Sequence, residues 1–81
     1  MIKTETKNEH LFFKFISELG LTNVYDNFIV SVPSGPKFIR LNEFDEIEVY
    51  EKCNENLLKV VNIDPKFDDV LSLFFKITKG I

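Results

Sequence analysis

The sequence predicts an α+β fold: a four-stranded antiparallel meander sheet with N- and C-terminal helices packed on one face. Two apolar segments with helical periodicity lie near the two ends of the chain, and between them the apolar period changes to two. Helices segregated from a run of strands with short connections are typical of this class. The predicted order of elements is therefore α-β-β-β-β-α.

The first helix is predicted over residues 9–19, which include most of the stretch LFFKFISELG at residues 11–20. Its apolar residues cover an arc of roughly 200°, wider than the stripe with which a helix faces one core. Asn8 is the expected N-cap, because its side-chain oxygen can accept a free backbone N–H. Gly20 suits the left-handed residue that ends a helix. Residues 1–7 are polar, and we expect them to fray.

The second helix is predicted over residues 65–79, and it ends before Gly80. Asp64 is the expected N-cap, and Pro65 fits the first helical position, where no N–H is needed. The apolar residues of this segment again cover about 200° of the helical wheel. Both helices are therefore predicted to have more apolar surface than a single contact with the sheet requires.

Four strands are predicted between the helices, over residues 28–32, 37–41, 46–51 and 57–63. The first two flank PSGP, a turn signal, and form a hairpin. The third alternates acidic and apolar residues. The fourth is apolar on nearly both faces, which suits a central strand; a short helix is the alternative for this segment.

The composition indicates one domain, spanning residues 1–81. The chain is 44% hydrophobic with a net charge of −3, which argues against disorder. A single cysteine, Cys53, cannot form an internal disulfide, and small secreted domains usually depend on disulfides. The first ten residues lack the apolar centre of a signal peptide, and no apolar run is long enough to span a membrane. We therefore expect a cytoplasmic protein without a membrane partner.

No catalytic, cofactor-binding or metal-binding site is predicted, and the chain is not expected to be an enzyme. His10, the only histidine, lies on the polar side of the first helical turn, where we expect a solvated surface residue; a general base needs an oriented partner and a substrate pocket. Cys53 has mostly acidic neighbours, which do not activate a thiol. No Cys/His pair has zinc spacing, and no phosphate-binding loop is present. An enzyme built on a carboxylate pair is a minor alternative.

The acidic stretch between residues 43 and 55 is the most informative polar feature. It holds six acids against one lysine, a local charge of −5: Glu43, Asp45, Glu46, Glu48, Glu51 and Glu55. This charge disfavours direct nucleic-acid binding, which needs a basic patch. One interpretation is a solvated face that keeps a small protein soluble. The other is a partner-binding surface for a basic groove on another protein, because opposite charge steers association.

The leading functional hypothesis is a small, acidic, non-enzymatic protein-binding module. A more specific form is an inhibitor encoded by a phage or mobile element that blocks a host nucleic-acid enzyme, such as a defence nuclease, in an anti-CRISPR-like manner. The absence of alanine and the use of nine lysines with one arginine are typical of an AT-rich genome, which favours this form.

The alternative is a structural subunit of a homo- or hetero-oligomer that dimerises through its Phe-rich helices. Large apolar patches rarely stay exposed on monomers. Phe13, Leu73 and Ile77 fall at the edges of the two apolar arcs. They are therefore the predicted oligomer contacts.

Overall fold

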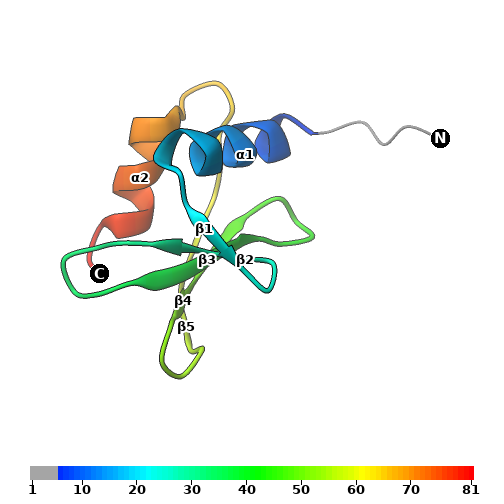
Figure 1. Cartoon of the computed structure of the whole chain (residues 1–81). Coiled ribbons are helices and arrows are strands. Elements are labelled where there is room, and N and C mark those ends of the chain that lie inside the picture. Colours follow the sequence, from blue (N-terminus) through cyan, green and yellow to red (C-terminus); the bar gives the residue numbers. More distant parts are fainter. Residues whose placement is uncertain (1–5) are drawn as a thin grey trace.

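The computed structural model describes residues 6–81, as two helices and a five-stranded antiparallel sheet (Figure 1). The elements are α1 (Lys7–Leu19), β1 (Thr22–Val24), β2 (Asn27–Val30), β3 (Lys37–Leu41), β4 (Ile47–Glu51), β5 (Leu57–Val61) and α2 (Val70–Thr78). The strands follow one another in the order β1-β2-β3-β4-β5, which is a meander. The α+β class is confirmed, and the prediction of four strands is wrong because β1 precedes the predicted set.

The helix α1 begins directly after Thr6, which forms a capping box with Glu9. The Thr6 Oγ1 accepts the Glu9 N–H at 3.0 Å, and the Glu9 Oε1 accepts the Thr6 N–H at 3.3 Å. The prediction of Asn8 as N-cap is therefore wrong. Of residues 1–7, which were expected to fray, the last two open the helix and the first five lie outside the described residues. Gly20 ends the helix with φ 61°, as predicted.

The helix α2 is shorter than the predicted span of 65–79 because a second aspartate caps it. The Asp69 Oδ1 accepts the Ser72 N–H at 2.7 Å, and Asp69 itself is extended with φ −123°. The segment after Asp64 forms one separate turn, in which the Asp68 N–H donates to the Asp64 carbonyl at 2.8 Å. The extended residue interrupts the helical run, so Asp64 caps a turn rather than the helix.

The unpredicted strand β1 joins β2 through a two-residue turn, Tyr25–Asp26. Both residues have positive φ, 51° and 68°, as a type I′ hairpin turn requires. The Asn23 Oδ1 supports the turn by accepting the Asp26 N–H at 3.3 Å. Such turns are usually marked by Asn-Gly or Asp-Gly, so Tyr-Asp conceals this one in the sequence.

Replacing Tyr25–Asp26 by Asn-Gly is expected to stabilise the fold by about 1–2 kcal/mol, because a left-handed residue with a Cβ costs roughly that amount. The Tyr25 side chain is 95% exposed, so its loss removes little packing. Urea unfolding of the Y25N/D26G variant measures the gain. Tyr25→Ala is the control, because it removes the ring but keeps the strained Cβ. If Tyr25→Ala raises the free energy of unfolding as much as Y25N/D26G does, backbone strain in the turn is not the cause of the gain.

The core lies between the two helices and one face of the sheet, and Figure 1 shows both helices on the same side of the strands. It consists of Phe12, Phe15, Ile16, Val30, Ile39, Ile47, Val49, Val61, Ile63, Leu73 and Ile77. The opposite sheet face is not covered by either helix. An antiparallel sheet tolerates this arrangement because alternate side chains point to opposite faces.

The strand β5 confirms the strand prediction for residues 57–63 over its first five residues, and the helical alternative is wrong. Its expected central position is also wrong, since β5 forms an edge of the sheet. The apolar residues of β5 are partly buried and partly exposed. Val61 is buried in the core, whereas Leu57, Leu58 and Val60 are 52%, 39% and 44% exposed.

Candidate functional site

The six acidic residues predicted to form a partner-binding surface are spread along the β4 strand and both of its turns. Three lie in the β3–β4 turn, two in β4 and one in the β4–β5 turn: Glu43, Asp45 and Glu46; Glu48 and Glu51; and Glu55. Figure 1 shows the two turns well apart, green at the right and yellow-green at the bottom. A strand rises roughly 3.3 Å per residue, so the two groups of turn acids cannot line one small groove.

Glu51 neutralises a buried lysine within the fold. The Lys37 Nζ lies 3.4 Å from the Glu51 Oε1, and it also donates to the Gly35 carbonyl at 3.3 Å. The Lys37 side chain is only 5% exposed. The charge of Glu51 is therefore committed to an internal ion pair.

Glu48 is the centre of a polar cluster on the uncovered sheet face. Its Oε1 accepts the Arg40 Nε–H at 2.7 Å and the Tyr50 hydroxyl at 2.6 Å, and its Oε2 accepts the Asn42 amide at 3.3 Å. The hydrogen bond from Tyr50, followed by the one from Arg40, lowers the pKa of Glu48. The Glu48 carboxylate in turn raises the pKa values of Arg40 and Tyr50. Like Glu51, Glu48 has a cationic partner inside the chain, and it also accepts a hydrogen bond from the Tyr50 hydroxyl.

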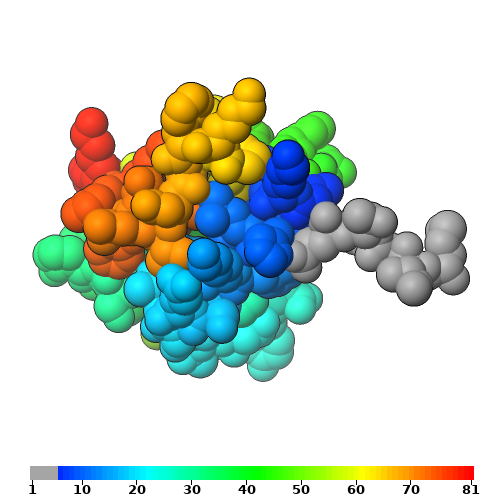
Figure 2. All heavy atoms as spheres, turned by 90° about the horizontal axis from the view of Figure 1, so that it is seen from above, coloured from blue at the N-terminus to red at the C-terminus, as the bar shows by residue number. Residues whose placement is uncertain are grey.

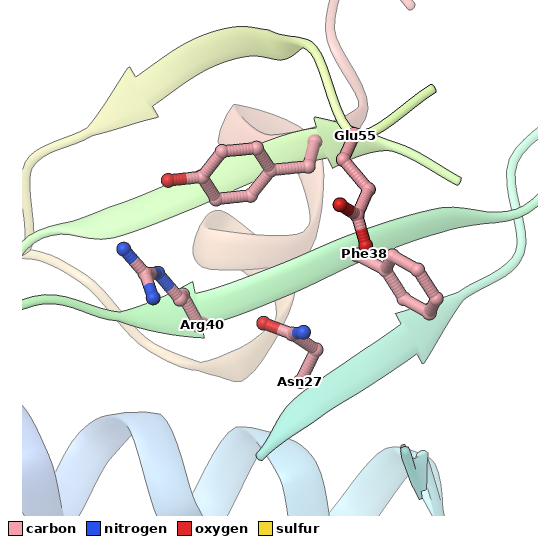
Figure 3. Close-up of a pocket in the computed structure, with 5 residues that line it drawn as sticks. Asn27, Phe38, Arg40 and Glu55 are labelled. Carbon is pink, nitrogen blue, oxygen red and sulfur yellow. The ribbon is translucent and has the colours of Figure 1, made fainter. Parts of the chain in front are cut away.

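A pocket of about 230 Å³ lies beside this cluster, lined by Asn27, Phe38, Arg40, Tyr50 and Glu55. In Figure 3, Phe38 and Arg40 rise from the same strand, and the Glu55 carboxylate points toward the Phe38 ring. The guanidinium of Arg40 lies over the Tyr50 ring, 5.5 Å from its centroid. Since Arg40 is already paired with Glu48, the pocket presents no free cation to an anionic ligand. Its lining gives no nucleophile with an oriented base.

Acid is expected to destabilise the fold partly through Glu48. Its pKa lies below the ordinary 4.5 in the folded chain, so its stabilising contribution is present above about pH 4.5 and is lost as the pH falls through the lowered value. Glu48→Gln should remove about 1 kcal/mol at pH 7 and flatten the loss of stability between pH 5 and pH 2. Urea unfolding across this pH range measures the effect. Equal slopes for E48Q and wild type contradict the expectation.

A groove of about 510 Å³ between α1 and the β3–β4 turn brings together two features that the sequence suggested separately. We call it the acidic groove, and it is lined by Thr6, Glu9, Phe13, Leu41, Asn42, Glu43 and Asp45. Phe13 is 46% exposed. Among residues 6–81, three carboxylates and no basic side chain line this groove. The structure thus joins Phe13 to Glu43 and Asp45, but not to Glu51 or Glu55.

Two asparagines hold the walls of the acidic groove. The Asn42 Oδ1 accepts the N–H groups of Phe44 and Glu46, both at 2.9 Å, which shapes the β3–β4 turn. The Asn8 amide donates to the Asp45 carbonyl at 3.3 Å, which ties α1 to that turn. The Asn42 bonds lie within the turn and the Asn8 bond crosses to it from α1, so the chain's own hydrogen bonds hold both walls of the groove.

Phe44 is an exposed aromatic residue near the acidic groove that sequence reasoning missed. It is 73% exposed at the tip of the β3–β4 turn, between Glu43 and Asp45. It does not line the acidic groove but a separate hollow of about 330 Å³ that it shares with Arg40 and Glu48. Within the acidic groove, Phe13 provides apolar surface beside carboxylates. That combination suits a lysine or arginine side chain, whose methylene stem packs on rings while its charge meets the acids.

The predicted oligomer contacts Leu73 and Ile77 lie in the core, both 0% exposed, so their expected position at the rim of α2 is wrong. Periodicity gives the width of an apolar arc but not which part of it meets the sheet. The exposed positions are Phe67, Leu71 and Phe75, at 79%, 62% and 61%. From above, α1 and α2 lie side by side (Figure 2), and a hollow of about 500 Å³ lies between them.

Among residues 6–81, no group of three or more His, Cys, Asp or Glu side chains is placed to hold a metal ion. Cys53 is exposed in the β4–β5 turn. Neither of the two described helices is long and apolar enough to cross a bilayer.

Comparison with protein-family models, with curated proteins and with solved structures found no match. The class is therefore defined by the fold and the groove alone. It is a small α+β protein with a meander sheet and a preformed acidic groove beside the start of α1.

Proposed function

We propose that this chain is a non-enzymatic protein-binding module that holds a basic segment of another protein in the acidic groove. The observation that carries the proposal is the convergence of Glu9, Glu43 and Asp45 around the half-exposed Phe13 ring. These residues come from α1 and the β3–β4 turn, which are far apart in the sequence. Charged rims with an aromatic centre are typical of protein interfaces.

The groove binds by combining charge and apolar contact. A partner lysine or arginine lays its stem on Phe13, and its cation meets Glu43 and Asp45. Because these carboxylates are near solvent, their attraction is screened by salt. The affinity therefore falls as ionic strength rises, mostly through slower association.

In its more specific form, the proposal makes the chain an inhibitor of a nucleic-acid enzyme, encoded by a phage or mobile element. The basic segment is then part of the surface with which the enzyme neutralises phosphates. The net charge of −3 and the composition typical of an AT-rich genome support this form. It implies that nucleic acid and this chain compete for the same surface.

Affinity capture tests the groove by using the wild-type chain and its variants as separate baits. The wild-type chain should capture a basic partner whose binding Glu43→Lys and Phe13→Ala weaken by more than ten-fold, as substitutions of central interface residues do. Glu18→Lys is the matched control, since it makes the same charge change on α1 outside the groove. A partner retained equally by Glu43→Lys and Glu18→Lys excludes the acidic groove as its binding site.

A second candidate is a structural subunit that dimerises through its helices. The exposure of Leu71 and Phe75, four residues apart on α2, favours it. Sedimentation of wild type and of Phe75→Glu separates the two candidates. A concentration-dependent dimer that Phe75→Glu abolishes supports this function, whereas a monomer at millimolar concentration excludes it.

A further inference from the structure

The strand β5 is the longer of the two open edges of the sheet. Within residues 6–81, no strand pairs with its outer side. The other edge, β1, has three residues, whereas β5 has five, LLKVV. Natural edge strands are usually blunted by shortness, charge, bulges or proline. β5 has one charge, Lys59, and a register irregularity at Leu58 near its start, so its regular segment, residues 59–61 with Val60 44% exposed, is the part suited to accept an added strand.

The hydrogen-bond pattern shows which backbone groups of β5 point outward. The Glu51 N–H donates to the Asn56 carbonyl at 2.8 Å, so Glu51 bonds toward β5. On the regular β3–β4 ladder, the Asn42 N–H donates to the Glu46 carbonyl at 2.8 Å, so Glu46 bonds toward β3. Because the direction alternates along an antiparallel strand, Val49 bonds the opposite way, toward its β5 register partner Lys59. Val60, the next residue, therefore directs its N–H and carbonyl away from the sheet.

The two sides of this edge differ in chemistry. Val60 lies on the uncovered sheet face, opposite Glu48, and the exposed Leu58 lies near it at the register irregularity. Lys59 lies on the helix face, where its Nζ donates to the carbonyl of Lys79 at 3.0 Å and to that of Lys76, at the end of α2. These three lysines border a hollow of about 320 Å³ next to β5. Within residues 6–81, only Lys76 of the three has a carboxylate partner, Asp68 at 2.9 Å.

We propose that the β5 edge is a second binding site, which accepts an extended acidic peptide segment of another protein as a sixth strand. The backbone of that segment bonds to Val60. Its side chains alternate, with apolar ones beside Leu58 and Val60 and acidic ones beside Lys59 and Lys79. Charge complementarity selects this occupant: a second copy of the chain would place lysines against lysines, since β5 itself carries no acid.

This site is independent of the acidic groove and has the opposite charge preference. The groove takes a basic segment between α1 and the β3–β4 turn, whereas the edge takes an acidic one beside β5 and α2. Either binding activity can fail without the other. A chain with both sites would connect a basic and an acidic partner.

The probe for this site is a fluorescent, end-capped VEVEVEV peptide, N-methylated at alternate residues so that it offers one hydrogen-bonding edge and does not self-assemble. Fluorescence anisotropy should show binding with a Kd on the order of 100 µM, as expected for a small interface. The matched VKVKVKV peptide should bind at least ten-fold more weakly. Binding should also slow the hydrogen exchange of the Val60 amide.

Two variants localise the binding. Lys79→Glu should weaken the peptide complex about ten-fold, whereas Lys14→Glu, the same charge change on α1, should leave it unchanged. Val60→Pro should abolish binding by removing the outward N–H, and proline is tolerated on edge strands at such positions. If Val60→Pro unfolds the chain, the two lysine variants still decide the result.

Three results overturn the proposal. The first is equal affinity for VEVEVEV and VKVKVKV. The second is an equal effect of Lys14→Glu and Lys79→Glu. The third is a dimer, detected by sedimentation, that buries the Val60 amide and excludes the peptide, because the occupant of the edge would then be a second copy.

Discussion

Phe12→Ala should destabilise the fold by about 3–5 kcal/mol, whereas Phe13→Ala should cost about 1 kcal/mol or less. The two residues are neighbours in α1, so both substitutions change helix propensity equally. Phe12 is 1% exposed and packs edge-on against Phe28, with ring centroids 5.9 Å apart. Its removal leaves a cavity in the core. Phe13 is 46% exposed at the acidic groove and loses mainly its edge contact with Phe12.

Chemical denaturation followed by circular dichroism measures this difference. A domain of this size has a total stability of roughly 4–12 kcal/mol, so Phe12→Ala should be unfolded or close to it at 37 °C. Phe13→Ala should keep a cooperative transition with an unchanged m-value. Similar losses for the two variants contradict the placement of Phe12 in the core and Phe13 on the rim. Because Phe13→Ala stays folded, it also serves as a partner-binding variant of the acidic groove.

The strands with a complete apolar pattern are those that sequence reasoning located best. Residues 37–41 coincide with β3, and β4 and β5 fall within the predicted segments 46–51 and 57–63. The strand β1 escaped detection because it has three residues, two of them exposed, and a turn without glycine. A short edge strand is stabilised mainly by pairing with its neighbour, and the local sequence does not encode that pairing.

Helix boundaries were less predictable because several residues compete for each cap. Asn8 and Thr6 are both good N-caps, but only Thr6 has a glutamate three residues later, which completes a capping box. At α2, Asp64 and Asp69 are both possible N-caps, and Asp69 is the one that caps the helix. The capping-box spacing was visible in the sequence. The choice between Asp64 and Asp69 depends on how the connection reaches the core.

The candidate site was predictable in part. Glu43, Asp45 and Phe13 converge on one groove, although they were selected for two separate reasons. Glu48 and Glu51 do not join them, because strand register places each beside a cation of β3. Composition reports the charge of a segment but not its register. Because Glu48 and Glu51 are paired within the fold, the predicted acidic surface keeps only its turn residues, Glu43, Asp45, Glu46 and Glu55.

Glu51→Ala is expected to destabilise the fold by about 2–4 kcal/mol, because it leaves a buried ammonium without its carboxylate. The Lys37 side chain is 5% exposed, and after the substitution its Nζ keeps only the Gly35 carbonyl, 3.3 Å away. Glu51 itself is 31% exposed, so water reduces the effect below that of a fully buried pair. Thermal and urea unfolding measure it.

The reverse substitution separates the charge from the packing. Lys37→Met keeps the volume of the side chain and removes its charge, and replacing a buried charge by an apolar group of similar size is often neutral or stabilising. We expect the free energy of unfolding of Lys37→Met to lie within about 1 kcal/mol of the wild-type value. The K37M/E51A double variant should then recover most of the stability that Glu51→Ala loses, giving a coupling energy of about 1–3 kcal/mol. If the double variant is as unstable as Glu51→Ala alone, Glu51 stabilises the chain through something other than Lys37, and its charge returns to the set available to a partner.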